Sequence, residues 1–212
     1  MAFDPQTVLQ WLRRLVNLDT RVFEDVRTNP AATIPAVLVA AVSLLLSGVG
    51  GWLWWMLQDY GGAGDVFVES TIFGSLLALV LWGLAWLLVT FVVLTQVLRE
   101  RVYLEQLLRV MGLAMVPLAL SIFMFVPGIS LGVGVASLAL TFGLTTIAIQ
   151  SVTTADPAQV LIANAAGFLL WAAVLTLVVS PENPLAPGVF LFNAPAGFLE
   201  GADLAEFFEL LG

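Results

Sequence analysis

Residues 110–155 read VMGLAMVPLALSIFMFVPGISLGVGVASLALTFGLTTIAIQSVTTA, a run of 46 residues without an ionisable side chain. Pro127 and Gly128 divide this run almost in half, and a Pro-Gly pair is a strong turn signal. Each half contains the ~20 apolar residues that an α-helix needs to cross the ~30 Å hydrocarbon core of a bilayer. The stretch therefore predicts a transmembrane helical hairpin.

The composition of the whole chain agrees with this local pattern. Hydrophobic residues make up 60% of the 212 residues, charged residues make up 10%, and the mean hydropathy is +1.03. A water-soluble domain of this size could not bury so much apolar surface, so we expect an all-α, polytopic membrane protein. Cysteine and histidine are both absent, which removes disulfides, the commonest zinc ligands and Ser-His catalysis. We expect no cofactor, no bound metal and no nucleic-acid partner.

Five apolar runs predict a bundle of five transmembrane helices. The runs cover residues 34–57, 71–98, 107–126, 128–150 and 159–180. Asn29-Pro30 precedes the first run and Asp156-Pro157 precedes the fifth, and each pair is typical of an N-cap followed by a first-turn proline. The helix starts are therefore the best-marked boundaries.

The second and third runs carry irregular features. The second run, 71–98, is longer than a perpendicular crossing requires, so we expect tilt or a protruding turn at its cytoplasmic end. Pro117 lies in the middle of the third run and predicts a kink. The chain then divides into an N-terminal segment, residues 1–30, a transmembrane domain, residues 31–180, and a C-terminal tail, residues 181–212.

The basic residues predict the orientation. All seven are arginines, and they occur before the first run or between the second and third runs: Arg13, Arg14, Arg21, Arg27, Arg99, Arg101 and Arg109. Two crossings separate the groups, so both lie on one side, which the positive-inside rule makes cytoplasmic. We therefore expect a multi-pass protein of the plasma membrane with a cytoplasmic N-terminus and an external C-terminus.

Both terminal segments have amphipathic patterns. Over residues 5–27, Trp11 and other apolar side chains form one arc, while Arg13, Arg14 and Arg21 lie opposite, which predicts one interfacial helix on an anionic membrane surface. The alternative is a helical pair that is broken near Asn17 and packs against the loop after the second run.

The tail, residues 181–212, is both acidic and apolar. Phe207, Phe208 and Leu211 share one side of a helical pattern, with acidic residues on another side. We expect this external tail to cover the outer ends of the bundle, and the alternative is that these three side chains contact a partner protein.

The transmembrane runs contain no ionisable residue that could act as a catalytic group or couple ion transport. Asn164 lies about one turn into the fifth run, where its amide is expected to bond to a neighbouring helix rather than to a ligand. Gly128, Gly132 and Ala136 recur at four-residue spacing, which predicts close packing inside the hairpin or at the face of a homodimer.

Several of these features together resemble the Yip1 family of membrane proteins in its short prokaryotic form. They are the five runs, the Asn29-Pro30 entry, and the series Arg109, Gly112, Ala114, Pro117 and Pro127-Gly128, within about residues 20–180. The resemblance implies no catalytic residues. Eukaryotic members act in vesicle traffic and associate with small GTPases through a longer cytoplasmic region that carries an acidic-Leu-aromatic-Gly-Pro motif. No such motif occurs in this sequence, so a small GTPase is not an expected partner.

The sequence therefore predicts a non-enzymatic membrane protein. We expect it to act as an adaptor, organiser or accessory subunit through contacts with membrane lipids, a membrane-protein partner or a second copy of the chain. A transporter or channel subunit for a neutral or lipid-like solute is the first alternative. The second is a membrane enzyme that uses an interfacial carboxylate, such as Glu100, Glu105 or Asp156, as its base.

Overall fold

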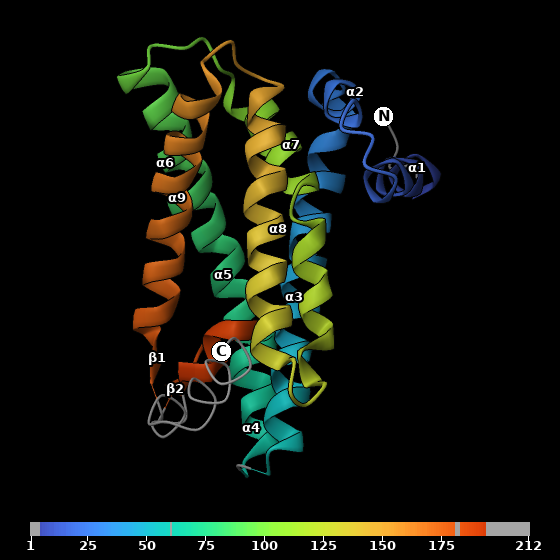
Figure 1. Cartoon of the computed structure of the whole chain (residues 1–212), viewed down its shortest axis with the longest axis vertical. Helices are drawn as coiled ribbons and strands as arrows, with labels where there is room; N and C mark the ends of the chain where they lie inside the picture. The colour runs from blue at the N-terminus through green and yellow to red at the C-terminus, as the bar shows by residue number, and fades with distance from the viewer. Residues whose placement is uncertain (1–4, 60, 181–182, 194–212) are drawn as a thin grey trace, which may run out of the picture.

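The computed structural model describes residues 5–59, 61–180 and 183–193. Its regular elements are helices apart from one hairpin of two short strands, each two residues long. Five of the described helices are long and apolar enough to cross a membrane, as the sequence predicts. They cover Pro30–Leu57, Ala63–Val97, Leu104–Phe125, Ser130–Gln150 and Pro157–Val178. The five lie side by side in one bundle (Figure 1), which is compatible with a multi-pass membrane protein.

The N-terminal segment forms two helices, so the prediction of a single helix over residues 5–27 is wrong. Helix α1 (Pro5–Val16) and helix α2 (Val22–Thr28) are separated by a turn in which Leu18 has a left-handed φ of 58°. The carboxylate of Asp19 accepts a hydrogen bond from the backbone N–H of Arg21 (3.1 Å) and stabilises this turn. The break near Asn17 agrees with the helical-pair alternative, and α2 packs against α7 (Leu104–Leu113) at the start of the third span.

Both proline-containing helix starts have the predicted caps. The side chain of Asn29 accepts a hydrogen bond from the N–H of Ala31 (3.0 Å). Asp156 accepts one from the N–H of Ala158 (2.9 Å) and forms a capping box with Gln159. The elements that follow these caps are η1 (Pro30–Ala32) with α3 (Thr33–Leu57), and α9 (Pro157–Val178).

The second span is longer than predicted, and its extra length lies at the end opposite to the arginines. It begins at Ala63 and ends at Val97, so the added residues lie at the end where the first and second spans are connected. Asp65 and Glu69 fall in the added part, and these charges had moved the predicted start to residue 71. The elements of the span are α4 (Ala63–Val66), α5 (Ser75–Leu81), α6 (Leu88–Val92) and three π-helical segments, η2 (Phe67–Gly74), η3 (Trp82–Leu87) and η4 (Val93–Val97).

The third span changes its helical type at the predicted irregularity. Helix α7 (Leu104–Leu113) is an α-helix, and η5 (Val116–Phe125) continues it as a 3-10 helix. Pro117 has no N–H, and its ring clashes with the carbonyl group four residues earlier in an α-helix, here that of Leu113. The last α-helical residue is accordingly Leu113.

The turn of the hairpin lies at Pro127 and Gly128, as predicted, and Gly128 has a φ of 81° that favours glycine. Helix α8 (Ser130–Gln150) starts after this turn and runs back toward the arginine end. Loops and α2 close that end, whereas the α3–α4 connection and the η5–α8 turn lie at the other end (Figure 1).

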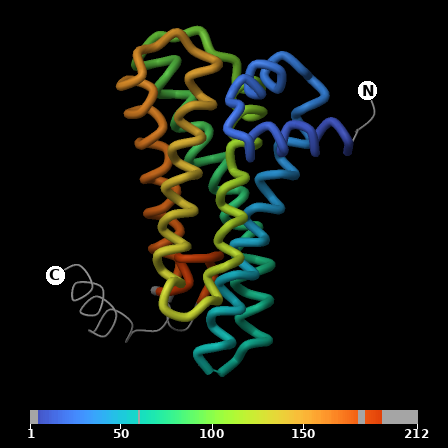
Figure 2. Tube along the Cα trace, turned by 45° about the vertical axis from the view of Figure 1, so that its right-hand side comes forward, coloured from blue at the N-terminus to red at the C-terminus, as the bar shows by residue number. Residues whose placement is uncertain are grey.

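The chain re-enters the bundle after the fifth span. Strands β1 (Val179–Ser180) and β2 (Asn183–Pro184) form a short antiparallel hairpin, and η6 (Gly188–Asn193) follows. Figure 2 shows η6, in red, crossing the bundle between its helices. Ala186 and Leu191 have no exposed surface. The described part of the tail therefore lies inside the bundle, and the rest of the tail, residues 194–212, lies outside the described residues.

Candidate functional site

The arginine end of the bundle is held by a buried arginine. Arg109 is only 6% exposed, and its guanidinium donates three hydrogen bonds. They reach the Thr33 hydroxyl (2.8 Å), the Arg27 carbonyl oxygen (3.0 Å) and the Glu105 carboxylate (3.0 Å). One side chain thus joins α2, α3 and α7. From the sequence, Arg109 is an orientation signal and part of the family resemblance. Its position inside the third run, residues 107–126, is what distinguishes it from the loop arginines.

A second set of hydrogen bonds at this end joins the loop after the second span to the loop between α8 and α9. The Glu100 carboxylate accepts hydrogen bonds from the Thr153 hydroxyl (2.8 Å) and from both the hydroxyl (3.0 Å) and the N–H (3.2 Å) of Thr154. The hydroxyl bonds from Thr153 and Thr154 are the main reason that the pKa of Glu100 lies below its ordinary value. A carboxylate that is stabilised in its charged form is a poor general base at neutral pH.

The other two carboxylates considered as bases also have structural partners. Glu105 pairs with Arg109, and Asp156 caps α9. In the described residues, no group of three or more acidic side chains is arranged to hold a metal ion. Glu100, Glu105 and Asp156 are therefore all engaged in interactions with other groups of the protein.

The arginines of α1 and α2 differ in their environments. Arg14 forms ion pairs with Asp25 and with Asp19 (2.7 Å for the latter), and these two carboxylates raise its pKa. The same contact with Arg14 lowers the pKa of Asp19. Arg13 and Arg21 are exposed, and neither side chain forms an ion pair with another residue in the described ranges.

Trp11 does not lie where the sequence analysis expected it. This side chain was predicted to contact the membrane surface, but it is 8% exposed and packs into the protein core together with Leu15. The reason is the turn at Leu18, which folds α1 back so that its apolar side faces the protein.

Asn164 lies at the centre of a buried polar network. Its Oδ1 accepts a hydrogen bond from the indole Nε1–H of Trp86 (2.7 Å). Its Nδ2 donates to the Thr146 hydroxyl (2.8 Å), the Thr145 hydroxyl (3.0 Å) and the Phe142 carbonyl oxygen (3.1 Å). The amide thus connects α9 with η3 and α8, and both of its polar atoms are occupied by protein groups.

An aromatic cluster surrounds this network. The Trp86 ring lies 4.9 Å from that of Phe168 and 5.3 Å from that of Trp171, between ring centroids. The Trp171 indole N–H donates to the carbonyl oxygen of Ala78 (3.0 Å). By contrast, the Trp82 indole nitrogen is buried and has no hydrogen-bond partner in the described part of the chain. These tryptophans fill the interior, and Trp82 differs from Trp86 and Trp171 in that its indole N–H has no partner among the described residues.

Hydroxyl groups also join the spans. The Thr71 hydroxyl donates to the Gly48 carbonyl oxygen and the Ser75 hydroxyl donates to that of Leu44, each over 3.1 Å. Both bonds connect the second span to α3. In α8, Thr141 donates to the carbonyl oxygen of Ser137 in its own helix (2.7 Å). These three hydroxyl groups are thus directed at backbone carbonyl groups.

The predicted small-residue face of α8 is not the face that packs. Gly132 has no neighbouring atom within 4 Å of an added Cβ, Ala136 is exposed, and Gly128 belongs to the turn. The expectation that these residues pack inside the hairpin is therefore wrong. Gly134 is the closely packed glycine, since its added Cβ would lie 2.9 Å from the Cβ of Val189. The re-entrant tail, which the sequence did not place, decides which side of α8 is covered.

Close backbone contacts occur instead along α3. An added Cβ on Gly50 would collide with the carbonyl oxygen of Ser121 in η5, and one on Gly112 would lie 2.7 Å from that of Ala36. Glycine lets these backbones approach closely, which is how apolar helices gain contact area in a membrane.

The described part of the tail has specific contacts inside the bundle. The Ser70 hydroxyl donates to the Ala186 carbonyl oxygen (2.7 Å), and this bond is buried. The Phe190 ring lies 5.5 Å from that of Trp171, and the Phe192 ring lies 4.1 Å from that of Trp54. The predicted partner-contact residues of the tail lie outside the described residues; they are Phe207, Phe208 and Leu211.

The chain was compared with known proteins. No family model, no curated protein and no solved structure matches it.

Proposed function

We propose that this chain is a non-enzymatic integral membrane protein that acts as an adaptor, organiser or accessory subunit through contacts made at the two ends of its bundle. The observation that carries the proposal is the occupied interior. The Asn164 amide uses both polar atoms on protein partners, and the segment 183–193 fills the space between the helices at one end. An interior of this kind offers little to a solute, whereas the ends carry the charged and amphipathic surfaces.

The proposal includes the orientation that the positive-inside rule favours. The arginine end then faces the cytoplasm, and the α3–α4 connection faces outward. Because the sequence contains no cysteine, single cysteines can report it. Gly64→Cys should react with an impermeant thiol reagent added to sealed cells, and Thr154→Cys should react only after permeabilisation. The opposite pattern would reverse the orientation. Gly188 is unsuitable as a reporter, since it is buried with a φ of 64°.

The resemblance to the Yip1 family supports the same class of function. It implies an integral membrane protein without catalytic residues, and it covers the spans rather than a soluble partner-binding region. We therefore also propose that the chain belongs to that family and that a small GTPase is not its partner.

The alternative is a transporter or channel subunit for a neutral or lipid-like solute. One observation favours it: Trp82 begins a π-helical segment, and its buried indole N–H has no hydrogen-bond partner among the residues that the structure describes. Segments of this type are rare and frequently occur at functional sites.

Purification from native membranes distinguishes the two functions. Each form of the protein should be isolated in mild detergent together with its bound partners. Four forms are compared: the wild type, a variant with Arg13→Gln and Arg21→Gln, a variant that lacks residues 198–212, and Asn164→Leu. A contact protein should lose partners when an end is altered and keep them in Asn164→Leu. An unchanged partner set in both end variants, together with loss of cellular activity in Asn164→Leu alone, would contradict the proposal and favour the solute site.

A further inference from the structure

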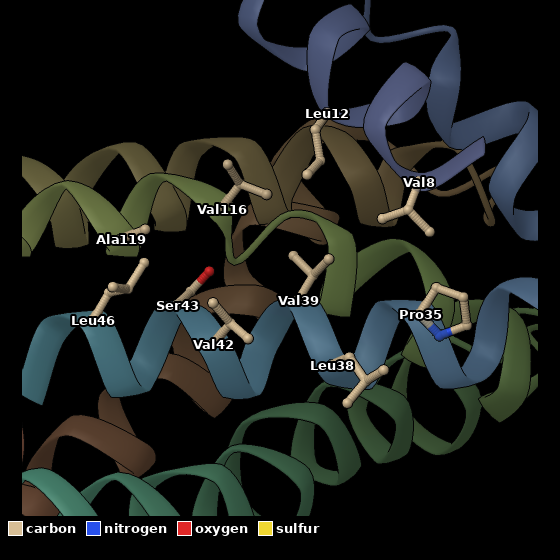
Figure 3. Close-up of a pocket in the computed structure, with 10 residues that line it drawn as sticks. All are labelled: Val8, Leu12, Pro35, Leu38, Val39, Val42, Ser43, Leu46, Val116 and Ala119. Atoms are coloured by element: carbon tan, nitrogen blue, oxygen red, sulfur yellow. The ribbon is translucent and has the colours of Figure 1, made fainter. Parts of the chain in front are cut away.

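A lateral groove lies beneath α1, near the arginine end of the bundle. Its roof is formed by Val8 and Leu12, which point into the space from α1, and its walls are α3 from Pro35 to Leu46 and the η5 residues Val116 and Ala119 (Figure 3). The groove has a volume of about 450 Å³, within the range of roughly 300–1,000 Å³ that is usual for small-molecule sites.

The depth of the groove matches one leaflet of a bilayer. From Pro35 to Leu46 the α3 wall is about 16 Å long at 1.5 Å per residue. The hydrocarbon core is ~30 Å thick, so this wall is about as long as half of the core. It begins near the start of the first span, which places the groove in the leaflet at the arginine end.

The walls have the chemistry of a hydrocarbon site with a single polar group. The groove-lining residues are apolar except for Ser43, whose hydroxyl points into the space in Figure 3. Ser43 is 3% exposed, and its hydroxyl has no hydrogen-bond partner among the described residues, unlike the Ser137 hydroxyl, which bonds to its own helix. An acyl chain can fill such a space, whereas water would find few partners there.

Charge near the roof favours an anionic headgroup. Arg13 follows the roof residue Leu12 directly in the sequence, is exposed and forms no ion pair with another described residue. Arg21 lies in the turn that leads into α2, and its side chain is likewise exposed and forms no ion pair with another described residue. Arg14 is already neutralised by Asp19 and Asp25, so Arg13 and Arg21 are the cations available to a lipid phosphate.

We propose that this groove binds one acyl chain of an anionic phospholipid from the leaflet at the arginine end, with its phosphate near Arg13. Helix α1 then covers a bound lipid rather than lying directly on α3. This inference rests on the proposed function, because it specifies the lipid that the arginine end contacts.

The test uses the full chain in lipid nanodiscs and phosphatidylglycerol that carries a photoreactive diazirine in its acyl chain. Adducts mapped by mass spectrometry should concentrate on Val39 and Val116, inside the groove. Ala119→Trp should abolish these adducts because the indole fills the groove. The matched control is Leu120→Trp, since residue 120 is exposed and does not line the groove, and it should leave the adducts unchanged. The melting temperature of each variant verifies that it is folded.

A second arm tests the headgroup. Replacing phosphatidylglycerol with phosphatidylcholine that carries the same acyl chain should weaken labelling, and Arg13→Gln should reduce the preference for phosphatidylglycerol about fivefold, as expected for ~1 kcal/mol per arginine at a membrane surface. Equal labelling with both headgroups would overturn the assignment of an anionic lipid.

Two further outcomes would overturn the inference as a whole. Adducts spread evenly over other lipid-facing residues, such as Leu140, would mean that only annular lipid is present. Rapid disulfide formation between Leu12→Cys and Val39→Cys without lipid displacement would mean that α1 closes the groove. Neither result depends on which partners co-purify with the protein. The lipid-binding inference and the proposed function can therefore be refuted independently.

Discussion

The indole nitrogen of Trp86 donates a 2.7 Å hydrogen bond to the side-chain oxygen of Asn164, and this bond joins the second span to the fifth in the interior of the bundle. The amide nitrogen of Asn164 extends the connection to Thr145 and Thr146 of the fourth span. A single amide therefore links three of the five spans.

Asn164→Leu should destabilise the bundle by about 1–3 kcal/mol, because the Trp86 N–H and the two threonine hydroxyls lose a buried partner. The value is kept low by the modest strength of hydrogen bonds between membrane helices, about 0.6 kcal/mol on average. Thermal unfolding in detergent, followed by tryptophan fluorescence, measures the effect. Thr176→Val is the control, since Thr176 is exposed and bonds within its own helix. Equal melting of Asn164→Leu and wild type would show that the network contributes no stability.

Gly50→Ala and Gly143→Ala should have opposite effects on stability. The added methyl group at Gly50 collides with the backbone of Ser121 and must separate α3 from η5, at a cost of about 1–3 kcal/mol. Gly143 lies in α8 and has open space around an added Cβ, so alanine should be neutral or stabilising by up to ~1 kcal/mol through its helix propensity. The same unfolding assay compares them. A Gly50→Ala protein as stable as Gly143→Ala would rule out the close contact.

The contrast between these glycines explains what the sequence could predict. Helix existence followed from apolar length, and the caps at Asn29 and Asp156 followed from local residue types, so both were correct. Which side of a helix packs was not predictable, because apolar residues face both lipid and protein in a membrane. Gly132 and Gly134 are the same residue type, and they differ in their tertiary contacts: Gly134 lies against Val189 of the re-entrant segment and Met124 of η5, whereas Gly132 has no such neighbour.

Charge misled the prediction in two places for the same reason. Asp65 and Glu69 shortened the predicted second span, although a span that protrudes from the bundle can carry charges at its end. Arg109 was read as an orientation signal, while its main contacts are internal. A charged residue shows its role only when its partners are known, and the partners come from other parts of the chain.

Arg109→Gln should detach α2 from the bundle. Glutamine is too short and has too few donors to replace three hydrogen bonds, and each bond to a charged group contributes about 1.5–3 kcal/mol. Hydrogen exchange of the α2 backbone should become faster, and the melting temperature should fall. Arg101→Gln serves as the control, because Arg101 is exposed and its side chain forms no ion pair within the described part of the chain. Unchanged exchange in α2 would show that the apolar contacts of Phe23 and Val26 are sufficient.

Acidification should release the loop that joins α8 to α9. The folded pKa of Glu100 lies below its ordinary value of 4.5, so its contribution is fully present above pH 4.5 and is lost as the pH falls through the folded pKa. The protection of Thr153 and Thr154 against hydrogen exchange, taken relative to the intrinsic exchange rate at each pH, should therefore decrease when the pH falls below that ordinary value. Glu100→Gln should remove this acid dependence. If acid reduces the exchange protection of this loop equally in the wild type and in Glu100→Gln, the role of Glu100 is disproved.

An interior that is closed to water is the central feature of the bundle. Cysteine accessibility tests it most directly, because the chain has no cysteine of its own. Single cysteines at Ser75, Thr141 and Ala163, all buried between the spans, should be compared with one at the exposed Gly64, in native membranes with a small water-soluble methanethiosulfonate. We predict rapid labelling at residue 64 and none at the three interior positions on the same timescale. Labelling of the interior positions, from either side of the membrane, would reveal an aqueous path and contradict the closed-bundle account.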